Sequence, residues 1–303
     1  MSDTDSNWYE AREEDPRAFT RVAVLGAGTM GHGIAQVCAM AGYGVTLHDI
    51  DLVAVETGLE RIRKNLDKGV QLGKVAAAVR ETTLASLSTT TDLPKAVEGA
   101  GLVIEAAPES LDLKKEIFRR VEEGVPAETI LATNTSSISI DALAGDLTHP
   151  GRFIGLHFFN PVFIMALVEV VVGEATSQET LDVAVKFVTR LEKEPIVVRD
   201  TPGFASSRLG VALGLEAMRM VEAGVASAEA IDAAMELGYR HPMGPLKLTD
   251  LVGLDVRLGI AEYLFEELGS EVFRPPEILR RMVEEGKMGK KSGEGFYRWD
   301  DGA

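Results

Sequence analysis

A glycine-rich turn between an apolar run and a helical stretch constrains the fold of this chain more than any other feature. The run Arg21–Leu25 is short and apolar, and it leads directly into Gly26-Ala-Gly-Thr-Met-Gly31. Behind the turn, Ile34 and Val37 fall on one apolar side of a helical pattern, and 45–47 forms a second apolar run. A strand, a glycine turn, a helix and a second strand make one βαβ unit, which has a right-handed crossover in a parallel sheet.

Strand and helix patterns keep alternating as far as residue 200. We expect strands at 86–90, 102–106, 129–132, 153–156, 166–172 and 196–199, the first two of them buried. We expect helices at 93–97 and 111–123, and a long, charged amphipathic helix at 51–73 that forms a projecting hairpin with 74–85. This alternation predicts an α/β fold with a Rossmann-type, doubly wound sheet.

The pattern changes after Asp200-Thr-Pro-Gly203, where the Pro-Gly pair marks a boundary. Beyond it we find almost no strand signal and expect helices at 209–222, 227–237, 246–268 and 276–285. The chain is therefore predicted to have three parts. They are a flexible tail at 1–19, a Rossmann-type domain at 20–200 and a smaller all-helical domain at 201–303.

Charge and cysteine content exclude several classes of protein. The 303 residues carry 31 Lys and Arg against 47 Asp and Glu, a formal net charge of −16, which argues against binding to nucleic acid or anionic lipid. No apolar run reaches the roughly 20 residues of a membrane span, and the acidic start does not resemble a secretory signal. Cys38 is the only cysteine, so no internal disulfide forms and a reducing cytoplasm is expected.

The glycine turn has the context of a dinucleotide site. Gly26 permits the sharp turn, Gly28 leaves room for a pyrophosphate, and Gly31 lets helix and strand pack closely. Thr29 and Met30 complete the turn, and the helix N-terminus behind them favours an anion. A purely structural turn is the alternative.

Asp49 stands at the end of the second strand and indicates which dinucleotide binds. A carboxylate there accepts both ribose hydroxyls of NAD and repels the 2′-phosphate of NADP. Ile50 follows, and no Arg or Lys stands nearby to favour that phosphate, so we expect NAD. The alternative is a helix-capping role shared with Asp51.

A histidine and a glutamate in the second half of this domain form a candidate acid–base pair. His157 ends a strand within Gly155-Leu-His-Phe-Phe-Asn-Pro161, and Glu169 lies in an otherwise apolar strand. A buried carboxylate needs a partner. If the two strands pair through the loop between them, Glu169 reaches His157 and stabilises the imidazolium formed when His157 takes a proton. The alternative is a strand-end histidine bound to backbone.

Seven strings extend this picture when taken in order. They are Gly26-x-Gly-x-x-Gly31, Asn134-Thr-Ser-Ser137, His157-Phe-Phe-Asn-Pro161, Leu167-Val-Glu-Val-Val171, Thr201-Pro-Gly-Phe204, His241-Pro-Met-Gly-Pro245 and Lys291-Ser-Gly-Glu-Gly-Phe-Tyr297. Each string alone is weak, but the ordered set resembles the 3-hydroxyacyl-CoA dehydrogenase family, and most of all its short prokaryotic 3-hydroxybutyryl-CoA dehydrogenases. The resemblance implies reversible, NAD-dependent oxidation of a (3S)-3-hydroxyacyl-CoA, with His157 as the base and a homodimer built through the helical domain.

The same resemblance implies further site residues. Ser136 matches the serine that binds the substrate's 3-oxygen, and Asn160 matches a residue near the nicotinamide ribose. Glu109, Lys114 and Lys291 match positions that touch the cofactor. Read without the family, Ser136 caps a helix at 138–143 and Lys114 is a solvated helix charge.

Ser207 departs from the family pattern. It stands where the family usually carries an asparagine near the histidine and the substrate. Serine is shorter but keeps a donor and acceptors, so we expect Ser207 to hold a polar contact with the substrate, directly or through water.

The anionic coenzyme A needs a basic handle. The residues expected to bind it are Arg61, Lys64, Asn65 and Lys68, of which Asn65 stands at a family contact position. A plain solvated helix face explains this charged stretch equally well.

Competing functions remain open at this point. No Cys/His cluster has metal-ligand spacing, so no metal is expected. Related dehydrogenases of gulonate or carnitine would share the fold and the His–Glu pair but need no coenzyme A handle. A non-catalytic NAD-binding protein is a further alternative, against which the set Ser136, His157 and Glu169 argues.

Overall fold

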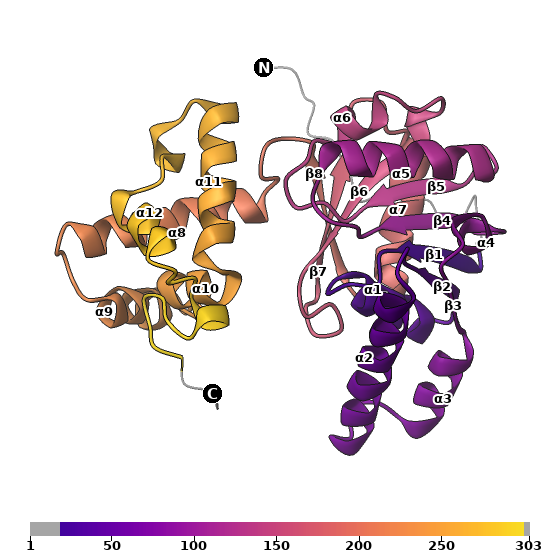
Figure 1. The fold of residues 1–303 in the computed structure, drawn as a ribbon, viewed down its shortest axis with the longest axis horizontal. Helices are drawn as coiled ribbons and strands as arrows, with labels where there is room; N and C mark the ends of the chain where they lie inside the picture. Colours follow the sequence, from indigo (N-terminus) through magenta and orange to yellow (C-terminus); the bar gives the residue numbers. More distant parts are fainter. Residues whose placement is uncertain (1–18, 300–303) are drawn as a thin grey trace. The chain divides into compact units, whose positions relative to one another are not determined.

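The computed structural model describes residues 19–299, and the chain divides into two compact units between Asp200 and Thr201 (Figure 1). The tail expected at 1–19 lies outside the described residues except for Phe19. The Phe19 ring stacks on Tyr43 with 5.4 Å between ring centroids.

The first unit is built on one eight-stranded sheet with the order β3-β2-β1-β4-β5-β6-β7-β8. The strands are β1 (Arg21–Leu25), β2 (Gly44–His48), β3 (Leu87–Thr90), β4 (Leu102–Glu105), β5 (Ile130–Thr133), β6 (Phe153–Phe158), β7 (Leu167–Val172) and β8 (Glu194–Arg199). Every neighbouring pair is parallel except β6 and β7, which form an antiparallel pair. The order reverses between β1 and β4, as in a doubly wound sheet, so the predicted fold class is confirmed.

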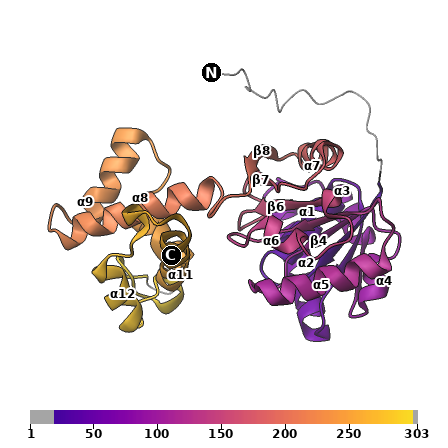
Figure 2. The same ribbon diagram turned by 90° about the horizontal axis from the view of Figure 1, so that it is seen from above.

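Helices cover both faces of this sheet. They are α1 (Gly31–Met40), α2 (Leu52–Gln71), α3 (Ala77–Ala85), α4 (Leu93–Val97), α5 (Leu111–Gly124), α6 (Ile140–Ala144) and α7 (Gln178–Arg190). Figure 2 shows α5 and α7 on opposite sides of the strands.

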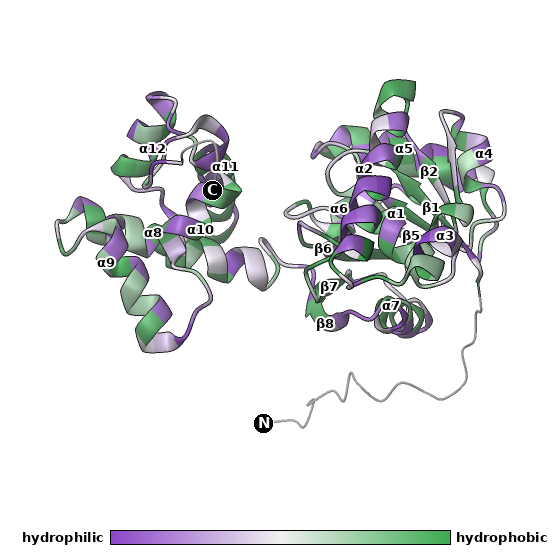
Figure 3. Cartoon of the chain, turned by 90° about the horizontal axis from the view of Figure 1, so that it is seen from below, coloured by the Kyte–Doolittle hydropathy of each residue, from purple (hydrophilic) through white to green (hydrophobic). Residues whose placement is uncertain are grey.

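Successive residues of β6 explain why both faces must be covered. Phe153 packs edge-on against Phe118 of α5, with ring centroids 4.7 Å apart. The next residue, Ile154, belongs to the core that includes Ile34 of α1 and Phe187 of α7. Strands buried on both faces read as continuous apolar runs. The surrounding helices instead carry both hydrophobic and hydrophilic segments (Figure 3).

Two elements of the first unit differ from the prediction. The strand expected to be buried at 86–90 is β3, an edge strand whose residues are exposed or half-buried. Its polar sequence Leu-Ser-Thr-Thr suits an edge. Helix α7 was not predicted, because its β-branched residues obscure the helical spacing of Leu181, Ala184 and Val188, all buried. The hairpin of α2 and α3 is confirmed (Figure 1).

The second unit contains only helices and turns within its described residues, apart from two isolated bridges near the chain end. They are α8 (Ser206–Glu222), α9 (Ala228–Ala233), a π-helical turn (Ala234–Gly238), α10 (Pro245–Val252), α11 (Leu254–Leu268), α12 (Glu277–Glu284) and 3-10 turns at Glu271–Phe273 and Lys290–Ser292. Their shared core includes Leu215 of α8, Leu254 of α11 and Leu279 of α12, each at most 1% exposed. The all-helical prediction for this part is confirmed.

The single helix predicted at 246–268 is wrong in one respect, because it is broken at Gly253. This residue has φ +105°, a conformation that favours glycine, and it separates α10 from α11. The helix predicted at 227–237 is likewise divided, since α9 continues as the π-helical turn. Apolar periodicity runs through both interruptions and so does not reveal them.

A buried aspartate fastens the end of the described chain to α10. The carboxylate of Asp250, 1% exposed, accepts hydrogen bonds from Phe296 N at 2.9 Å, Tyr297 N at 2.9 Å and Trp299 Nε1 at 2.8 Å. Tyr297 Oη also donates to Asp232 at 2.7 Å. These bonds give the Lys291–Tyr297 string a structural role in closing the helical unit. None of the helices in 19–299 has the length and apolar content needed to cross a membrane.

Candidate active site

The glycine turn, Asp49, Ser136 and His157 gather at the carboxyl edge of the sheet of the first unit. Strands β1, β2, β4, β5 and β6 run parallel, so the segments that follow them emerge at the same edge. The glycine turn follows β1, Asp49 follows β2, Ser136 follows β5, and His157 lies near the end of β6. Ligands of doubly wound folds bind at this edge, beside the point where the strand order reverses.

The three glycines of the turn have different surroundings. Gly26 has φ +103°, and a Cβ there would lie 2.5 Å from the carbonyl oxygen of Ala106, the residue that follows β4. A Cβ on Gly31 would collide with the Gly26 carbonyl. A Cβ on Gly28 would meet no atom within 4 Å, so the turn is open on that side. Open space beside a helix N-terminus suits a pyrophosphate.

Asp49 belongs to the turn rather than to the helix behind it. Its Oδ2 accepts a hydrogen bond from Ala27 N at 2.8 Å, and its Oδ1 accepts one from Asp51 N at 3.3 Å. The capping role falls to Asp51, whose side chain accepts from Val53 N at 2.9 Å. Asp49 is half-buried and Ile50 is 89% exposed, so the carboxylate stands at the mouth of the turn.

His157 and Glu169 face each other across the antiparallel pair β6–β7. They are register partners, and His157 Nδ1 lies 2.7 Å from Glu169 Oε2. The Glu169 side chain has no exposed surface and that of His157 is 7% exposed. The alternative in which His157 binds only backbone is therefore wrong. The Phe159 ring also lies beside the imidazole, with 4.5 Å between centroids.

Glu109 holds the turn that carries Ser136. Its Oε1 accepts hydrogen bonds from Ser136 N at 3.1 Å, Thr135 Oγ1 at 2.5 Å and Ser137 Oγ at 3.2 Å. Ser136 does not cap the following helix, because the cap of α6 is Ser139, whose side chain accepts from Ala142 N. Ser136 is therefore fixed through its backbone, and it is half-buried.

Lys114 is buried rather than a solvated helix charge. It is 1% exposed, and its Nζ lies 2.5 Å from Glu105 Oε1 and 3.4 Å from Glu109 Oε2. Glu105 is fully buried at the end of β4 and also accepts from Ala107 N and Thr133 Oγ1, both at 2.6 Å. This network ties the ends of β4 and β5 to the Ser136 turn.

Two asparagines lie near the carboxyl end of β6, Asn134 after β5 and Asn160 after β6. Asn134 Oδ1 accepts a hydrogen bond from Phe158 N at 2.9 Å, which links the segment after β5 to the strand of His157. Asn160 is exposed on the loop after β6 and precedes a cis peptide bond to Pro161.

The expected coenzyme A handle lies on α2. Arg61, Lys64 and Lys68 are exposed on this helix, and Lys64 Nζ lies 3.6 Å from Glu60. Asn65 is half-buried and donates to Gln36 Oε1 of α1 at 3.1 Å. Asn65 thus holds α2 against the helix of the glycine turn.

Ser207 and Lys291 belong to the second unit. Ser207 is half-buried in the first turn of α8, after Gly203 and Phe204, which both have positive φ. Lys291 Nζ lies 2.5 Å from Asp255 Oδ1, beside the Gly253 break.

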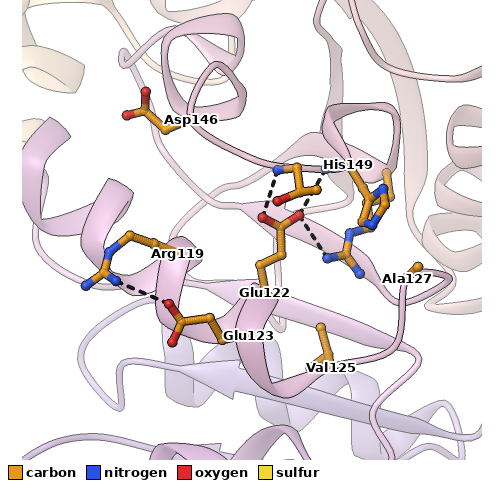
Figure 4. Close-up of a pocket in the computed structure, with 9 residues that line it drawn as sticks. Arg119, Glu122, Glu123, Val125, Ala127, Asp146 and His149 are labelled. Atoms are coloured by element: carbon orange, nitrogen blue, oxygen red, sulfur yellow. Dashed lines mark hydrogen bonds and ion pairs between the residues drawn. The ribbon is translucent and has the colours of Figure 1, made fainter.

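A separate pocket of about 280 Å³ lies at the opposite edge of the sheet. Its lining includes Ala127, just before β5, and His149 and Arg152, just before β6, so it faces the amino ends of these strands. Figure 4 shows Glu122 at its centre, bound by the residues around it. It is remote from the carboxyl edge and contains none of the predicted site residues.

Comparison with known families agrees with this geometry. The model of the 3-hydroxyacyl-CoA dehydrogenase NAD binding domain matches residues 21–201, and the model of the C-terminal domain of the same enzyme matches residues 203–299. The chain belongs to the 3-hydroxyacyl-CoA dehydrogenase family. It is an NAD-dependent oxidoreductase, as the sequence resemblance implied.

Individual members of the 3-hydroxyacyl-CoA dehydrogenase family are similar over nearly the whole chain. A Deinococcus radiodurans protein named probable 3-hydroxybutyryl-CoA dehydrogenase is 45% identical over 279 residues, covering 92% of this chain and 100% of the relative. A Bacillus subtilis protein of the same name is 43% identical over 281 residues, covering 93% and 98%. The crystal structure of (S)-3-hydroxybutyryl-CoA dehydrogenase from Ralstonia eutropha has a TM-score of 0.91 at 40% identity, covering 94% and 100%.

Sequence reasoning missed some residues of the site. Glu105 follows three apolar residues in β4, so the argument used for Glu169, a carboxylate in an apolar strand, also applied to it. Lys193, which holds the loop after β6, stands in a charged stretch and gave no such signal. Within 19–299, no three His, Cys, Asp or Glu side chains are grouped so as to hold a metal ion.

Proposed function

We propose that this 3-hydroxyacyl-CoA dehydrogenase interconverts (3S)-3-hydroxybutyryl-CoA and acetoacetyl-CoA. The observation that carries the proposal is the buried His157–Glu169 pair, with 2.7 Å between Nδ1 and Oε2, at the carboxyl edge of an NAD-binding domain. The short acyl chain is supported by the names of the similar proteins.

His157 is the proposed base. Because Nδ1 is occupied by the Glu169 carboxylate, Nε2 is the nitrogen that takes the 3-hydroxyl proton. The negative charge of Glu169 stabilises the resulting imidazolium and holds the ring in one orientation. In the reductive direction the same nitrogen returns the proton.

Ser136 is proposed to hold the reacting oxygen. Its backbone is fixed by Glu109, which leaves the hydroxyl as the group offered to substrate. NAD, when bound, supplies the nicotinamide carbon that accepts hydride from C3. Holding the oxygen and the base in one geometry removes much of the entropic part of the barrier.

The dinucleotide is proposed to bind along the glycine turn. Gly26, Gly28 and Gly31 shape the open side of the turn, with Thr29 and Met30 at the start of α1. Asp49 receives the adenine ribose, which favours NAD over NADP. Asn160, Glu109, Lys114 and Lys291 complete the proposed cofactor contacts; since Lys114 is 1% exposed, its contribution is made through Glu109.

Coenzyme A is proposed to bind the exposed face of α2. Arg61, Lys64 and Lys68 offer charge to its phosphates and Asn65 a polar contact. Ser207 is proposed to replace the usual asparagine as a polar contact to substrate. Affinity for free coenzyme A separates this proposal from a gulonate or carnitine dehydrogenase, because those substrates carry no such group.

The helical unit, 201–303, is proposed to form a homodimer in a reducing cytoplasm. It exposes large apolar side chains that a second copy can cover, among them Leu209 at 72%, Leu237 at 84% and Tyr239 at 76%. Cys38, the only cysteine of the sequence, is buried and forms no disulfide. A molecular mass of one chain by sedimentation at micromolar concentration would contradict the dimer.

The test is acetoacetyl-CoA reduction, followed through the loss of NADH absorbance, in wild type and His157→Ala. Rapid turnover that falls by about 100-fold to 10,000-fold in the variant establishes the reaction and its base. NADH binding without turnover in wild type contradicts the short-chain proposal and directs the search to longer acyl-CoAs, then to gulonate and carnitine.

A further inference from the structure

The loop between β6 and β7, residues 159–166, accepts two hydrogen bonds from the side chain of one lysine outside the loop. Lys193 lies between α7 and β8, and its Nζ donates to Val162 O and to Met165 O, both at 2.6 Å. The next residue, Glu194, donates its backbone N–H to Ala166 O at 2.8 Å. Two adjacent residues therefore hold three carbonyl groups of this loop.

These bonds reach the part of the loop that carries Asn160. Ile164 N and Met165 N both donate to Pro161 O, at 2.9 and 3.0 Å, so residues 161–165 form one turn. Lys193 fixes the far side of that turn, and Asn160 is joined directly to its near side. Hydrogen bonds from a cation to carbonyl oxygens are among the stronger ones in proteins.

The inner side of the loop rests on the helix of the glycine turn. Val162 is 2% exposed, and a Cβ on Gly33 of α1 would lie 2.8 Å from its Cβ. Val162 is thus packed against α1 on one side while its carbonyl is bound by Lys193. By contrast, Ile164 at the tip is 67% exposed, so packing alone does not fix the loop.

We propose that Lys193 is a positioning residue that fixes the β6–β7 loop and so holds Asn160 at the cofactor. The inference rests on the proposed role of Asn160 near the nicotinamide ribose. Lys193 is half-buried, and desolvation lowers its pKa, which means that burial destabilises the charged ammonium. Its bonds to the loop carbonyls offset this effect.

The test compares Lys193→Met with Lys193→Arg and with Lys95→Met. The Met variant keeps a long side chain without the ammonium, the Arg variant keeps charge and donors, and Lys95 is an exposed lysine of the same unit. Hydrogen exchange at Ile164 and Met165 reports on the loop, and NADH fluorescence reports on cofactor binding.

In Lys193→Met we expect both amides to exchange about tenfold faster and the Kd for NADH to rise about tenfold, since two charge-assisted bonds are lost. The KM for acetoacetyl-CoA should stay within about twofold. Lys95→Met should resemble wild type, and Lys193→Arg should lie between wild type and Lys193→Met, because guanidinium keeps the charge and donors in a different geometry. Unchanged loop exchange, or faster exchange with an unchanged Kd for NADH, overturns the proposal.

If Lys193→Met does not fold, Lys193→Gln replaces it with changes in the same direction but smaller, because Gln removes the charge and keeps a donor. Both readouts are independent of the acyl substrate. A wild-type protein that binds NADH without reducing acetoacetyl-CoA would contradict the proposed function, and the same measurements would still decide the role of Lys193.

Discussion

Glu105 at the end of β4 and Glu169 within β7 have equally buried side chains, with no exposed surface. Glu105 meets an ammonium, Lys114 Nζ, at 2.5 Å, whereas Glu169 meets an imidazole, His157 Nδ1, at 2.7 Å. Both pairs satisfy the requirement that a buried carboxylate be compensated. The partner differs, and with it the function of the region.

Imidazole is the side chain whose ordinary protonation equilibrium lies near neutral pH, so the β6–β7 pair can exchange a proton during a reaction. The ammonium of Lys114 instead distributes its donors between Glu105, Glu109 and the carbonyl of Ala107. The β4 region is therefore a support for the Ser136 turn, and the β6–β7 hairpin is where proton transfer is expected. A buried carboxylate in a strand predicts a partner, but the partner decides between support and chemistry.

Removing the charge of Glu105 should have the largest effect on stability. In Glu105→Gln the Lys114 ammonium stays buried without its closest carboxylate, which costs about 3–5 kcal/mol in the free energy of unfolding. Denaturant unfolding measures this loss. The kcat of the molecules that remain folded should fall less than in a His157 or Glu169 variant.

A double variant distinguishes the effect of an unpaired buried charge on stability from the effect of the hydrogen bonds that Glu105 accepts. Glu105→Leu with Lys114→Met removes both charges and should recover much of the stability, because an apolar pair avoids the desolvation penalty. If the double variant is as unstable as Glu105→Gln, the loss comes from the bonds to Ala107 N and Thr133 Oγ1, and the ion-pair account is wrong.

Removing the charge of Glu169 should act mainly on catalysis. In Glu169→Gln the imidazolium loses its counter-charge, and kcat for acetoacetyl-CoA reduction should fall about 100-fold. Gln keeps an amide oxygen as an acceptor for His157 Nδ1, so the unfolding free energy should change by no more than about 2 kcal/mol. Kinetic and denaturation measurements on Glu105→Gln and Glu169→Gln test this difference between support and catalysis. Equal effects of the two variants on kcat would contradict it.

The sequence predicted the carboxyl edge well because its signals are local. Gly26 needs a positive φ, and the strand that follows His157 returns through a short loop, so pairing of β6 with β7 places Glu169 opposite His157. The Asp49 position also followed from the end of a strand. These inferences need only strand order and alternation, which a sequence carries.

The features that the sequence did not predict depend on contacts between segments far apart in the chain, which no local pattern encodes. Lys193 binds carbonyl groups of a loop far from it in sequence. Every residue has a backbone carbonyl, so residue types do not reveal which carbonyls accept such bonds. The Gly253 break is invisible to periodicity, because apolar spacing continues from α10 into α11. The cap of α6 is Ser139 and not Ser136, because Ser136 is held through its backbone N–H by Glu109, which lies between β4 and α5.

A third carboxylate, at the pocket of Figure 4, provides the smallest predicted effect and lies far from the chemistry. Burial alone would raise the pKa of Glu122, but hydrogen bonds from Thr148 N at 2.8 Å, Arg152 Nη2 at 3.0 Å and His149 N at 3.1 Å lower it. A carboxyl whose pKa is lowered on folding stabilises the protein at neutral pH, and this contribution is lost as the pH falls through that lowered pKa.

Glu122→Gln should therefore reduce the unfolding free energy by about 2 kcal/mol at neutral pH, since three hydrogen bonds lose their charged acceptor. The deficit relative to wild type should shrink in acid, while kcat and KM stay unchanged. Glu123→Gln is the matched control, because Glu123 is 67% exposed and pairs with Arg119 at the surface, where about 0.5 kcal/mol is expected. Equal losses in the two variants, or a Glu122→Gln deficit that persists in acid, would mean that the bonds at the amino edge contribute packing rather than charge. Reduced turnover in Glu122→Gln would instead show that this edge is coupled to the His157–Glu169 hairpin.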